Sequence, residues 1–362
     1  MVSIFGFKKN FFTGVDFGTS AIKVVELTYK DQKVHLSNYA WADLSAVASR
    51  ETMEQRILSY DDKLKLYLET ILERMKLKSD SAYVALPAFI GLLALLELPE
   101  MRPDEMEKAV QYEARKYIPT SLSDVSLGWE IVKREDDTSV LVKKDSRGKV
   151  KILMVAAPIK EVDRYEKIVL STRLKINALE LETFSLVRSL IGDDQGTFLL
   201  IDIGARITNI ILVDRGIILS NRSVNIGGNE ITSSIAESLK IARSRAEAMK
   251  MEKRDILNSK ESALVLPPLE LIINEAQRMM LTGVSNFGKK TIDSVILSGG
   301  CAKMTGMEEY FSRMLRVPTM AGKPWQKIIT DARLASDIEK MGTSFSVALG
   351  LALRGVEEYR RS

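Results

Sequence analysis

The residues most capable of chemistry in this chain lie in a short pattern that occurs twice. Residues 14–27 read GVDFGTSAIKVVEL and residues 200–213 read LIDIGARITNIILV. In each copy an apolar strand ends in Asp-x-Gly, passes through small residues and continues as a second strand. A glycine at the bend leaves backbone N–H groups that suit phosphate oxygens, and the aspartate offers a hard carboxylate to a phosphate-bound Mg²⁺. Two such hairpins predict two related domains that bind one nucleotide between them.

A third glycine-containing turn, Ser298-Gly-Gly-Cys-Ala302, follows a predicted strand near the end of the chain. In their order and spacing the three turns resemble the phosphate-1, phosphate-2 and adenosine motifs of the actin-like superfamily. The resemblance implies an α/β fold built from duplicated RNase H-like domains. It also implies ATP and Mg²⁺ as ligands.

On this resemblance we expect the nucleotide contacts to come from the three turns and from the helix that contains Ala246-Glu247-x-x-Lys250, a motif of bacterial actin relatives. Lys23 stands where actin carries a phosphate-contacting lysine, and Thr208 keeps the Asp-x-Gly-x-x-x-Thr spacing of the second turn. The expected nucleotide-binding residues are Asp16, Gly18, Thr19, Ser20, Lys23, Asp202, Gly204, Ala205, Arg206, Thr208, Gly228, Glu247, Lys250, Gly299, Gly300, Lys303 and Met304. Asp16 and Asp202 are the expected Mg²⁺ ligands, directly or through water.

The second turn departs from the superfamily pattern, because Ala205-Arg206 replaces a pair of glycines. A missing glycine limits how closely the terminal phosphate can approach the backbone. Hydrolysis also needs a Gln, Glu or Asp that positions the attacking water, and the sequence nominates none. We therefore expect ATP binding with at most weak ATPase activity and leave the catalytic residues unassigned.

Residues 90–181 predict an α+β insert after the first hairpin and helix, a feature of the FtsA group that actin and MreB relatives lack. The expected division is 1–89 as subdomain 1A, 90–181 as inserted subdomain 1C, 182–196 as the return helix of 1A, 197–230 and 286–342 as subdomain 2A, 231–285 as subdomain 2B, and 343–362 as a C-terminal helix packing on 1A.

Several segments resemble the PilM family of type IV pilus assembly proteins more closely still. They are the aromatic and basic start before Gly-Val-Asp-Phe-Gly, the segment from Leu98 to Pro119, residues 221–232 (NRSVNIGGNEIT), and Leu271 to Arg278. The family implies a cytoplasmic protein, peripheral on the inner membrane, that binds the cytoplasmic tail of a PilN-like single-pass protein in a groove between the insert and the first subdomain. It further implies a link to pilus motor ATPases and leaves self-association open.

Two other functions remain open at this point. An FtsA-like division protein would form filaments, and that group usually ends in an amphipathic membrane helix, whereas this sequence stops soon after Glu358. A small-molecule kinase of the same fold would need a polar acceptor cleft, but the corresponding stretch, Ala82–Leu98, is apolar.

Composition excludes several classes of site. The chain has one cysteine and one histidine, so neither a disulfide framework nor a His-based zinc site or Ser-His-Asp triad is expected. A net charge of +4 with mixed signs does not indicate nucleic-acid binding. The longest apolar run, Ala88 to Leu96, is far shorter than the roughly 20 residues of a membrane helix.

The first twelve residues combine four aromatic side chains with two lysines. Two interpretations of this segment are open: a frayed start to the first strand, or a weak contact with an anionic membrane surface.

Overall fold

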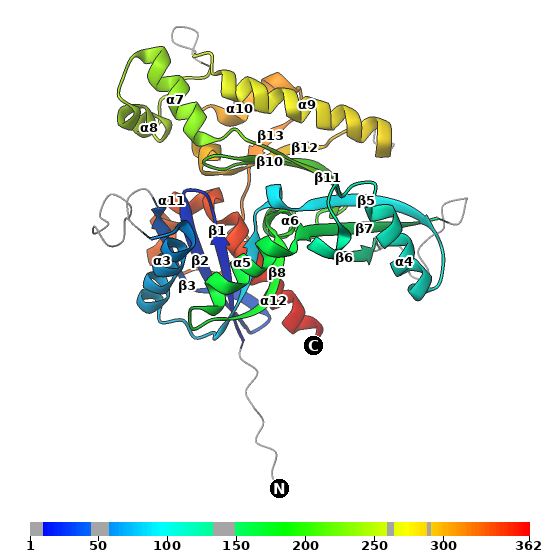
Figure 1. Ribbon diagram of the computed structural model, residues 1–362. Coiled ribbons are helices and arrows are strands. Elements are labelled where there is room, and N and C mark those ends of the chain that lie inside the picture. Colours follow the sequence, from blue (N-terminus) through cyan, green and yellow to red (C-terminus); the bar gives the residue numbers. More distant parts are fainter. Residues whose placement is uncertain (1–9, 45–57, 133–148, 259–263, 288–290) are drawn as a thin grey trace. The chain divides into compact units, whose positions relative to one another are not determined.

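The computed structural model describes residues 10–44, 58–132, 149–258, 264–287 and 291–362 (Figure 1). The chain divides into two compact units by its internal contacts. Unit 1 consists of Met1–Ala85, Tyr165–Leu190 and Lys323–Ser362, and unit 2 consists of Leu86–Arg164 and Ile191–Gly322. The aromatic and basic start of the chain lies outside the described residues up to position 9.

Unit 1 is built on a five-stranded sheet with the order β3-β2-β1-β4-β8. Its strands are β1 (Phe11–Phe17), β2 (Ala21–Lys30), β3 (Lys33–Asp43), β4 (Ser81–Leu86) and β8 (Lys175–Leu181). The first three form an antiparallel meander, and β1 pairs with β4 in parallel. β1 and β2 are buried almost throughout, as expected for apolar, β-branched strands in the centre of a sheet.

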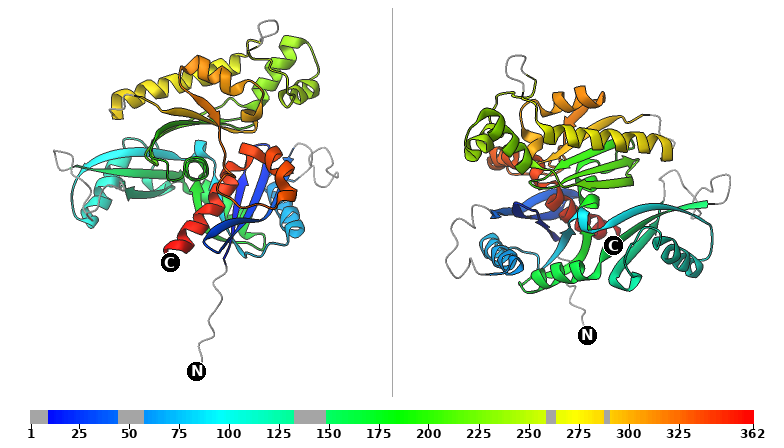
Figure 2. Two further views of the ribbon diagram at one scale, coloured as in Figure 1. Left: turned by 180° about the vertical axis from the view of Figure 1, so that it is seen from behind. Right: turned by 45° about the horizontal axis from the view of Figure 1, so that its top comes forward.

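Helices cover the sheet of unit 1. They are α3 (Tyr60–Met75), α6 (Glu182–Leu190), η4 (Ala332–Leu334), α11 (Ala335–Met341), η5 (Gly342–Phe345) and α12 (Ser346–Arg361). Ser59 caps α3 by accepting the Asp62 amide, and Lys76 ends it in the left-handed region, so local residues set both bounds of this helix. α12 packs on β1, β2 and α6 (Figure 2).

Unit 2 contains a second five-stranded sheet with the order β11-β10-β9-β12-β13. Its strands are β9 (Thr197–Ile203), β10 (Thr208–Asp214), β11 (Ile217–Val224), β12 (Ser294–Gly299) and β13 (Thr319–Ala321). Again three antiparallel strands precede two strands added in parallel. Because the two sheets share one strand order, the predicted duplication is present in the topology.

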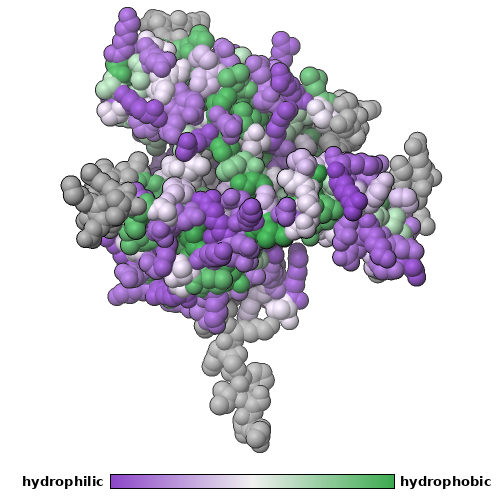
Figure 3. Space-filling view, viewed as in Figure 1, coloured by the Kyte–Doolittle hydropathy of each residue, from purple (hydrophilic) through white to green (hydrophobic). Residues whose placement is uncertain are grey.

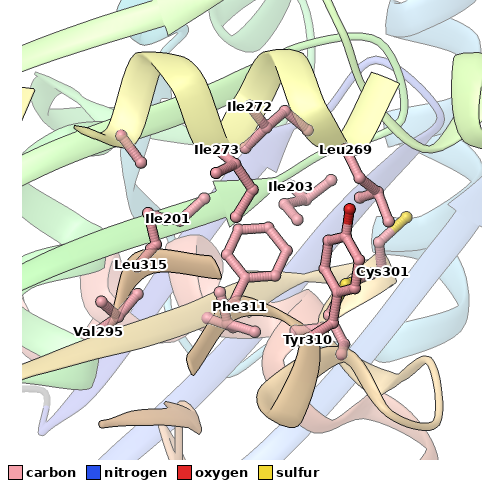
Figure 4. Packing of buried hydrophobic residues seen from close by; sticks show 14 of the residues in the cluster. Ile201, Ile203, Leu269, Ile272, Ile273, Val295, Cys301, Tyr310, Phe311 and Leu315 are labelled. Atoms are coloured by element: carbon pink, nitrogen blue, oxygen red, sulfur yellow. The ribbon is translucent and has the colours of Figure 1, made fainter. Parts of the chain in front are cut away.

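The helices of unit 2 are α7 (Gly228–Leu239), α8 (Arg243–Lys250), α9 (Pro267–Phe287), η3 (Gly300–Lys303) and α10 (Met307–Leu315). Their apolar faces enclose one core with the sheet. Ile201 and Ile203 from β9 meet Ile272 and Ile273 from α9, while Phe311 of α10 is fully buried beside them (Figure 4). This core fixes the ends of β9 and β12, where two of the glycine turns begin.

The insert forms a separate three-stranded antiparallel sheet with the order β5-β7-β6. Its elements are η1 (Ala88–Ile90), β5 (Leu92–Pro99), α4 (Pro103–Ala114), η2 (Leu122–Asp124), β6 (Val125–Ile131) and β7 (Lys149–Pro158). α4 covers the sheet through Met106, Val110 and Ala114. β5 contacts β11, and Leu95 packs against the core of the second sheet, which explains why the insert groups with unit 2.

Two parts of the expected division need correction. β8 was assigned to the insert, but it is the edge strand of the first sheet, next to β4. The pairing is long-range, with the Lys175 amide donating to the Asp80 carbonyl at 2.9 Å, so no local pattern reveals it. Residues 323–342, assigned to subdomain 2A, group with unit 1. The rest of the division stays a prediction. α5 (Ile159–Leu170) spans the change from unit 2 to unit 1.

Candidate functional site

The first turn of interest joins β1 to β2 in unit 1. Asp16, one residue before the end of β1, is buried and lies opposite Lys23 on β2. Lys23 Nζ is 3.5 Å from Asp16 Oδ2. Burial raises the pKa of the Asp16 carboxyl above its ordinary value, and the charge of Lys23 opposes that rise. Asp16 and Lys23 thus form a carboxylate–ammonium pair directly beneath the turn.

The turn itself needs a small residue at its start. A Cβ at Gly18 would lie 3.0 Å from the Ala21 carbonyl oxygen and 3.7 Å from Lys23 Nζ. Thr19 and Ser20 follow and are exposed. The structure therefore brings together all five residues predicted here, two charged ones below the turn and three small ones around it.

The corresponding turn of unit 2 joins β9 to β10. Asp202 is half-buried, one residue before the end of β9, but it lies opposite Asn209, where the first copy has lysine. Asn209 is buried and its Oδ1 accepts the Ser223 hydroxyl at 2.7 Å. The second aspartate therefore lacks the cross-strand lysine of the first, a difference that sequence reasoning did not register.

This second turn is locked to the start of α7. The Gly228 amide donates to the Gly204 carbonyl and the Asn229 amide to the Ala205 carbonyl, each at 2.8 Å. The Gly227 amide donates to the Glu230 carboxylate at 2.8 Å, as in a capping box. These three amides at the start of α7 are thus engaged within the protein. The turn is held rigid, and Arg206 projects from it as an exposed cation.

Thr208 lies beneath this turn. It is fully buried, and its hydroxyl donates to the Ile226 carbonyl at 2.7 Å. The bond ties the start of β10 to the segment that leads into α7. In the structure Thr208 therefore stabilises the turn from below. A direct contact between Thr208 and a nucleotide stays a prediction.

Glu247 and Lys250 join α8 to the same region. Lys250 is buried; its Nζ lies 2.9 Å from the Glu247 carboxylate and donates to the Gly228 carbonyl at 3.0 Å. Glu247 also accepts the Thr232 hydroxyl from α7, while about half of its side chain stays exposed. The predicted pair therefore borders the glycine turn of α7 and holds α7 and α8 together.

The third turn follows β12. Gly299 has φ +84°, and a Cβ there would overlap the Ile203 carbonyl oxygen, so the position requires glycine. A Cβ at Gly300, in contrast, would meet open space. Lys303 is half-buried, and Met304 lies in the hydrophobic core. Met304 is therefore placed to support the turn from within.

Cys301 is the residue at this site that sequence reasoning missed as a participant. It is buried, and a Cβ at Gly228 would lie only 2.8 Å from its Sγ and 3.3 Å from Lys250 Nζ. Burial raises the pKa of the Cys301 thiol; Lys250 opposes the rise, whereas Glu247 and Asp202 add to it. Its position directly after Ser298-Gly-Gly300 was the available signal.

Gly204, Gly228 and Gly299 thus come together in unit 2 beside Asp202 and Cys301. We call Gly204, Gly228, Gly299 and Gly300 the glycine cluster. Backbone turns free of side chains, next to a carboxylate and a buried ammonium, suit a phosphate-bearing ligand.

The described residues contain no preformed metal site at these turns. Among the described residues, no three His, Cys, Asp or Glu side chains are grouped so that they could hold a metal ion. Asp16 and Asp202 are single carboxylates, so the residues fit Mg²⁺ only where phosphate oxygens and water complete the shell, as is usual for phosphate-bound magnesium.

Comparison with known families identifies the chain. The family model described as type IV pilus assembly protein PilM matches residues 14–356. The chain belongs to the PilM family. The resemblance predicted from the sequence is thereby confirmed.

Solved structures confirm the actin-like fold of this PilM-family chain. The PilM-PilN type IV pilus biogenesis complex contains a chain with a TM-score of 0.77 and 24% identity, covering 95% of this chain and 98% of that one. The ethanolamine utilization protein EutJ from Carboxydothermus hydrogenoformans matches with a TM-score of 0.52 and 17% identity, over 96% of this chain and 90% of that one. MreB 5 of Spiroplasma citri bound to AMPPNP matches with a TM-score of 0.51 and 12% identity, over 98% and 99%.

Among curated proteins, cell division protein FtsA of Pseudomonas aeruginosa is 22% identical over 296 residues, which span 74% of this chain and 69% of FtsA. A search of the described helices for one long and apolar enough to cross a membrane finds none.

Proposed function

We propose that this chain is an ATP-binding scaffold of type IV pilus assembly or a related secretion machine. It binds the short cytoplasmic tail of a PilN-like single-pass protein of the inner membrane and is held at that membrane by the tail. The observation that carries the proposal is the match to the PilM family over residues 14–356. The likeness to a chain of the PilM-PilN type IV pilus biogenesis complex, over 95% of this chain, supports the choice of partner.

Nucleotide binding is supported by the glycine cluster of unit 2. Four residues around the cluster suit ATP. The exposed Arg206 would contact a phosphate, and Asp202 would face a phosphate-bound Mg²⁺. The Glu247–Lys250 pair at the border would contact the ribose and the base. One solved structure of this fold, MreB 5 of Spiroplasma citri, holds AMPPNP. The turn of unit 1, with Asp16 and Lys23, is the second proposed phosphate contact.

Turnover is expected to be slow. Bound Mg²⁺ would supply charge neutralisation at the phosphates, while the residues of the turns bind and orient them. Arg206 stands where the superfamily has glycine, and no described residue is identified as a base for water. ATP then acts mainly as a conformational ligand, which shifts a population only by its differential affinity for two states.

The insert is the proposed docking site for the membrane-protein tail. It carries two large exposed aromatic side chains, Tyr112 at 69% and Tyr117 at 45% exposure, beside the Glu113–Lys116 ion pair at the C-terminal end of α4. Aromatic side chains flanked by charges are the usual anchors of a peptide interface. Contacts with pilus motor ATPases and self-association are proposed on the family likeness alone.

A peptide pull-down tests the partner. The cytoplasmic tail of a PilN-like protein from the same genome, immobilised on a resin, should retain the wild-type chain. The double change Tyr112→Ala and Tyr117→Ala should weaken binding about tenfold or more. Tyr60→Ala, which changes an exposed tyrosine (55%) on α3 of unit 1, should not. Equal retention of all three proteins would remove the insert from the proposal.

An FtsA-like role is the second candidate, favoured by the 22% identity to FtsA over 296 residues. Electron microscopy of the chain with Mg-ATP and lipid vesicles separates the two. Long protofilaments on the vesicles would favour the division protein, and their absence together with capture by the PilN-like tail would favour the pilus scaffold.

A further inference from the structure

One end of unit 1 carries a concentration of exposed cations. It is the end away from the Asp16 turn, where β1 begins and β2 ends. Much of the lower part of unit 1 in Figure 3 is hydrophilic. Six exposed basic residues define what we call the basic end: Lys30, Lys33, Lys76, Lys78, Lys175 and Arg360.

The tip of the β2–β3 hairpin and the end of α12 meet at this place. Lys30 and Lys33 face one another across the tip. The guanidinium of Arg360, near the end of α12, lies 5.9 Å from the centre of the Tyr29 ring. Three of the six cations, Lys30, Lys33 and Arg360, therefore lie at or beside the tip of this hairpin.

The other three come from the segments that lead into β4 and β8. Lys78 Nζ lies 4.7 Å from the centre of the Phe11 ring at the start of β1. Lys76 ends α3 two residues earlier, and the Lys175 amide donates to Asp80, just before β4. The six residues therefore come from four separate stretches of sequence that the fold of unit 1 gathers at one end.

Acidic residues offset this charge only in part. Asp31 lies 4.0 Å from Lys30, and Asp80 is exposed beside Lys175. Glu73 and Arg74, in the last turn of α3, are both exposed and carry opposite charges. Glu358 is paired with Arg354 at 2.8 Å. Six cations against the two acids Asp31 and Asp80 leave an excess of four positive charges.

We propose that the basic end binds the surface of an anionic lipid membrane. Basic side chains near such a surface each strengthen binding roughly fivefold, and apolar residues beside them add to it. Leu170 at the end of α5 is 56% exposed.

A nucleic acid is the less suitable partner. Binding of a single strand uses aromatic rings that are free to stack on bases. Here the rings are engaged within the protein, because the Tyr29 and Tyr359 centroids are 6.0 Å apart and Phe12 lies 5.6 Å from Tyr359. The lipid proposal does not depend on nucleotide or tail binding, so either can fail without the other.

Vesicle co-sedimentation tests it with the purified full chain. Vesicles of phosphatidylcholine mixed with phosphatidylglycerol should bind the protein, and phosphatidylcholine alone should not. The triple change Lys30→Glu, Lys33→Glu and Arg360→Glu should lower binding to the mixed vesicles by about tenfold or more. The wild-type binding should also fall steeply with added salt, a readout that needs no variant.

The matched control reverses three exposed cations of unit 2 and gives the same net charge: Lys108→Glu, Arg115→Glu and Lys160→Glu. It should retain binding to the mixed vesicles, and circular dichroism should show both triple variants folded. An equal loss in both variants, equal binding to neutral vesicles, or binding to duplex DNA that exceeds binding to the vesicles would overturn the proposal.

Discussion

Asp16 and Lys23 face one another across β1 and β2, with Oδ2 and Nζ 3.5 Å apart, in a turn whose duplicate pairs Asp202 with Asn209. The two copies of one hairpin therefore differ in charge at the same register position. In the first copy an ammonium stands beside the metal-binding candidate, and in the second an uncharged amide does. Asp16 and Asp202 thus occupy equivalent positions with different cross-strand neighbours.

Asp16→Asn should change stability in a pH-dependent way. The carboxyl has a raised pKa when folded, so the folded chain keeps this proton where the unfolded chain has released it. This contribution to stability is full below the ordinary pKa of 3.8 and is lost as the pH rises through the raised folded-state pKa. The variant lacks that loss, so its free energy of unfolding relative to wild type should rise as the pH increases from below 3.8.

Urea unfolding of both proteins at several pH values measures this difference. A constant difference across the range would show that Asp16 is not the buried carboxyl described above. In calorimetry the same variant should lose affinity for Mg-ATP, because it removes one of the two carboxylates proposed as Mg²⁺ ligands.

Gly299→Ala and Gly300→Ala form a matched pair at the third turn. Gly299 has a positive φ and no room for a Cβ, so alanine there should destabilise the chain by about 3 kcal/mol. Gly300 faces open space, and alanine there should change the free energy of unfolding by less than about 0.5 kcal/mol. The midpoints of urea unfolding measure this difference. Similar midpoints for the two variants would refute the geometry of the turn.

Cys301, the single cysteine, should report nucleotide binding. Its thiol is buried and its raised pKa keeps it protonated near neutral pH, so a disulfide reagent should label it slowly in the folded chain and rapidly in urea. Saturating Mg-ATP should slow the labelling of the folded chain about threefold or more, because Cys301 borders the glycine cluster. An unchanged rate at saturating Mg-ATP would contradict binding at this cluster.

The anchoring of α12 rests on a charged network around Glu180. Its carboxylate, 7% exposed, lies 2.7 Å from Arg188 and 2.9 Å from Arg354. Glu180→Ala leaves two partly buried guanidinium groups without this partner and should destabilise the chain by about 2 kcal/mol. Lys65→Ala, which breaks the exposed pair with Glu69, should change stability by less than about 0.5 kcal/mol. Thermal melts compare them, and equal effects would reject the network as an anchor.

Local patterns predicted the hairpins and most helices, because each is specified by its own residues. The bounds of α3 follow from the Ser59 cap, the apolar spacing and the terminal Lys76. α4 ends at Ala114, where the amides of Tyr117 and Ile118 both donate to the Ala114 carbonyl. The proline at 119 marked the end of the segment without fixing the last helical residue.

The remaining parts of the fold depend on pairing between distant residues, which limited their prediction from the sequence. The place of β8 in the first sheet depends on Asp80, almost a hundred residues earlier, and the grouping of the insert with unit 2 depends on contacts between β5 and β11. At the candidate site the turns were visible as Asp-x-Gly and Gly-Gly, whereas the burial of Thr208 and Met304 and the approach of Cys301 to Gly228 are consequences of tertiary packing.

The most direct test of the central claim is a crystal structure of the full chain with Mg²⁺ and a non-hydrolysable ATP analogue. The account predicts the phosphates beside Gly204, Gly228 and Gly299, with Mg²⁺ facing Asp202 directly or through water. A nucleotide bound elsewhere on the chain, with the glycine cluster empty, would contradict it.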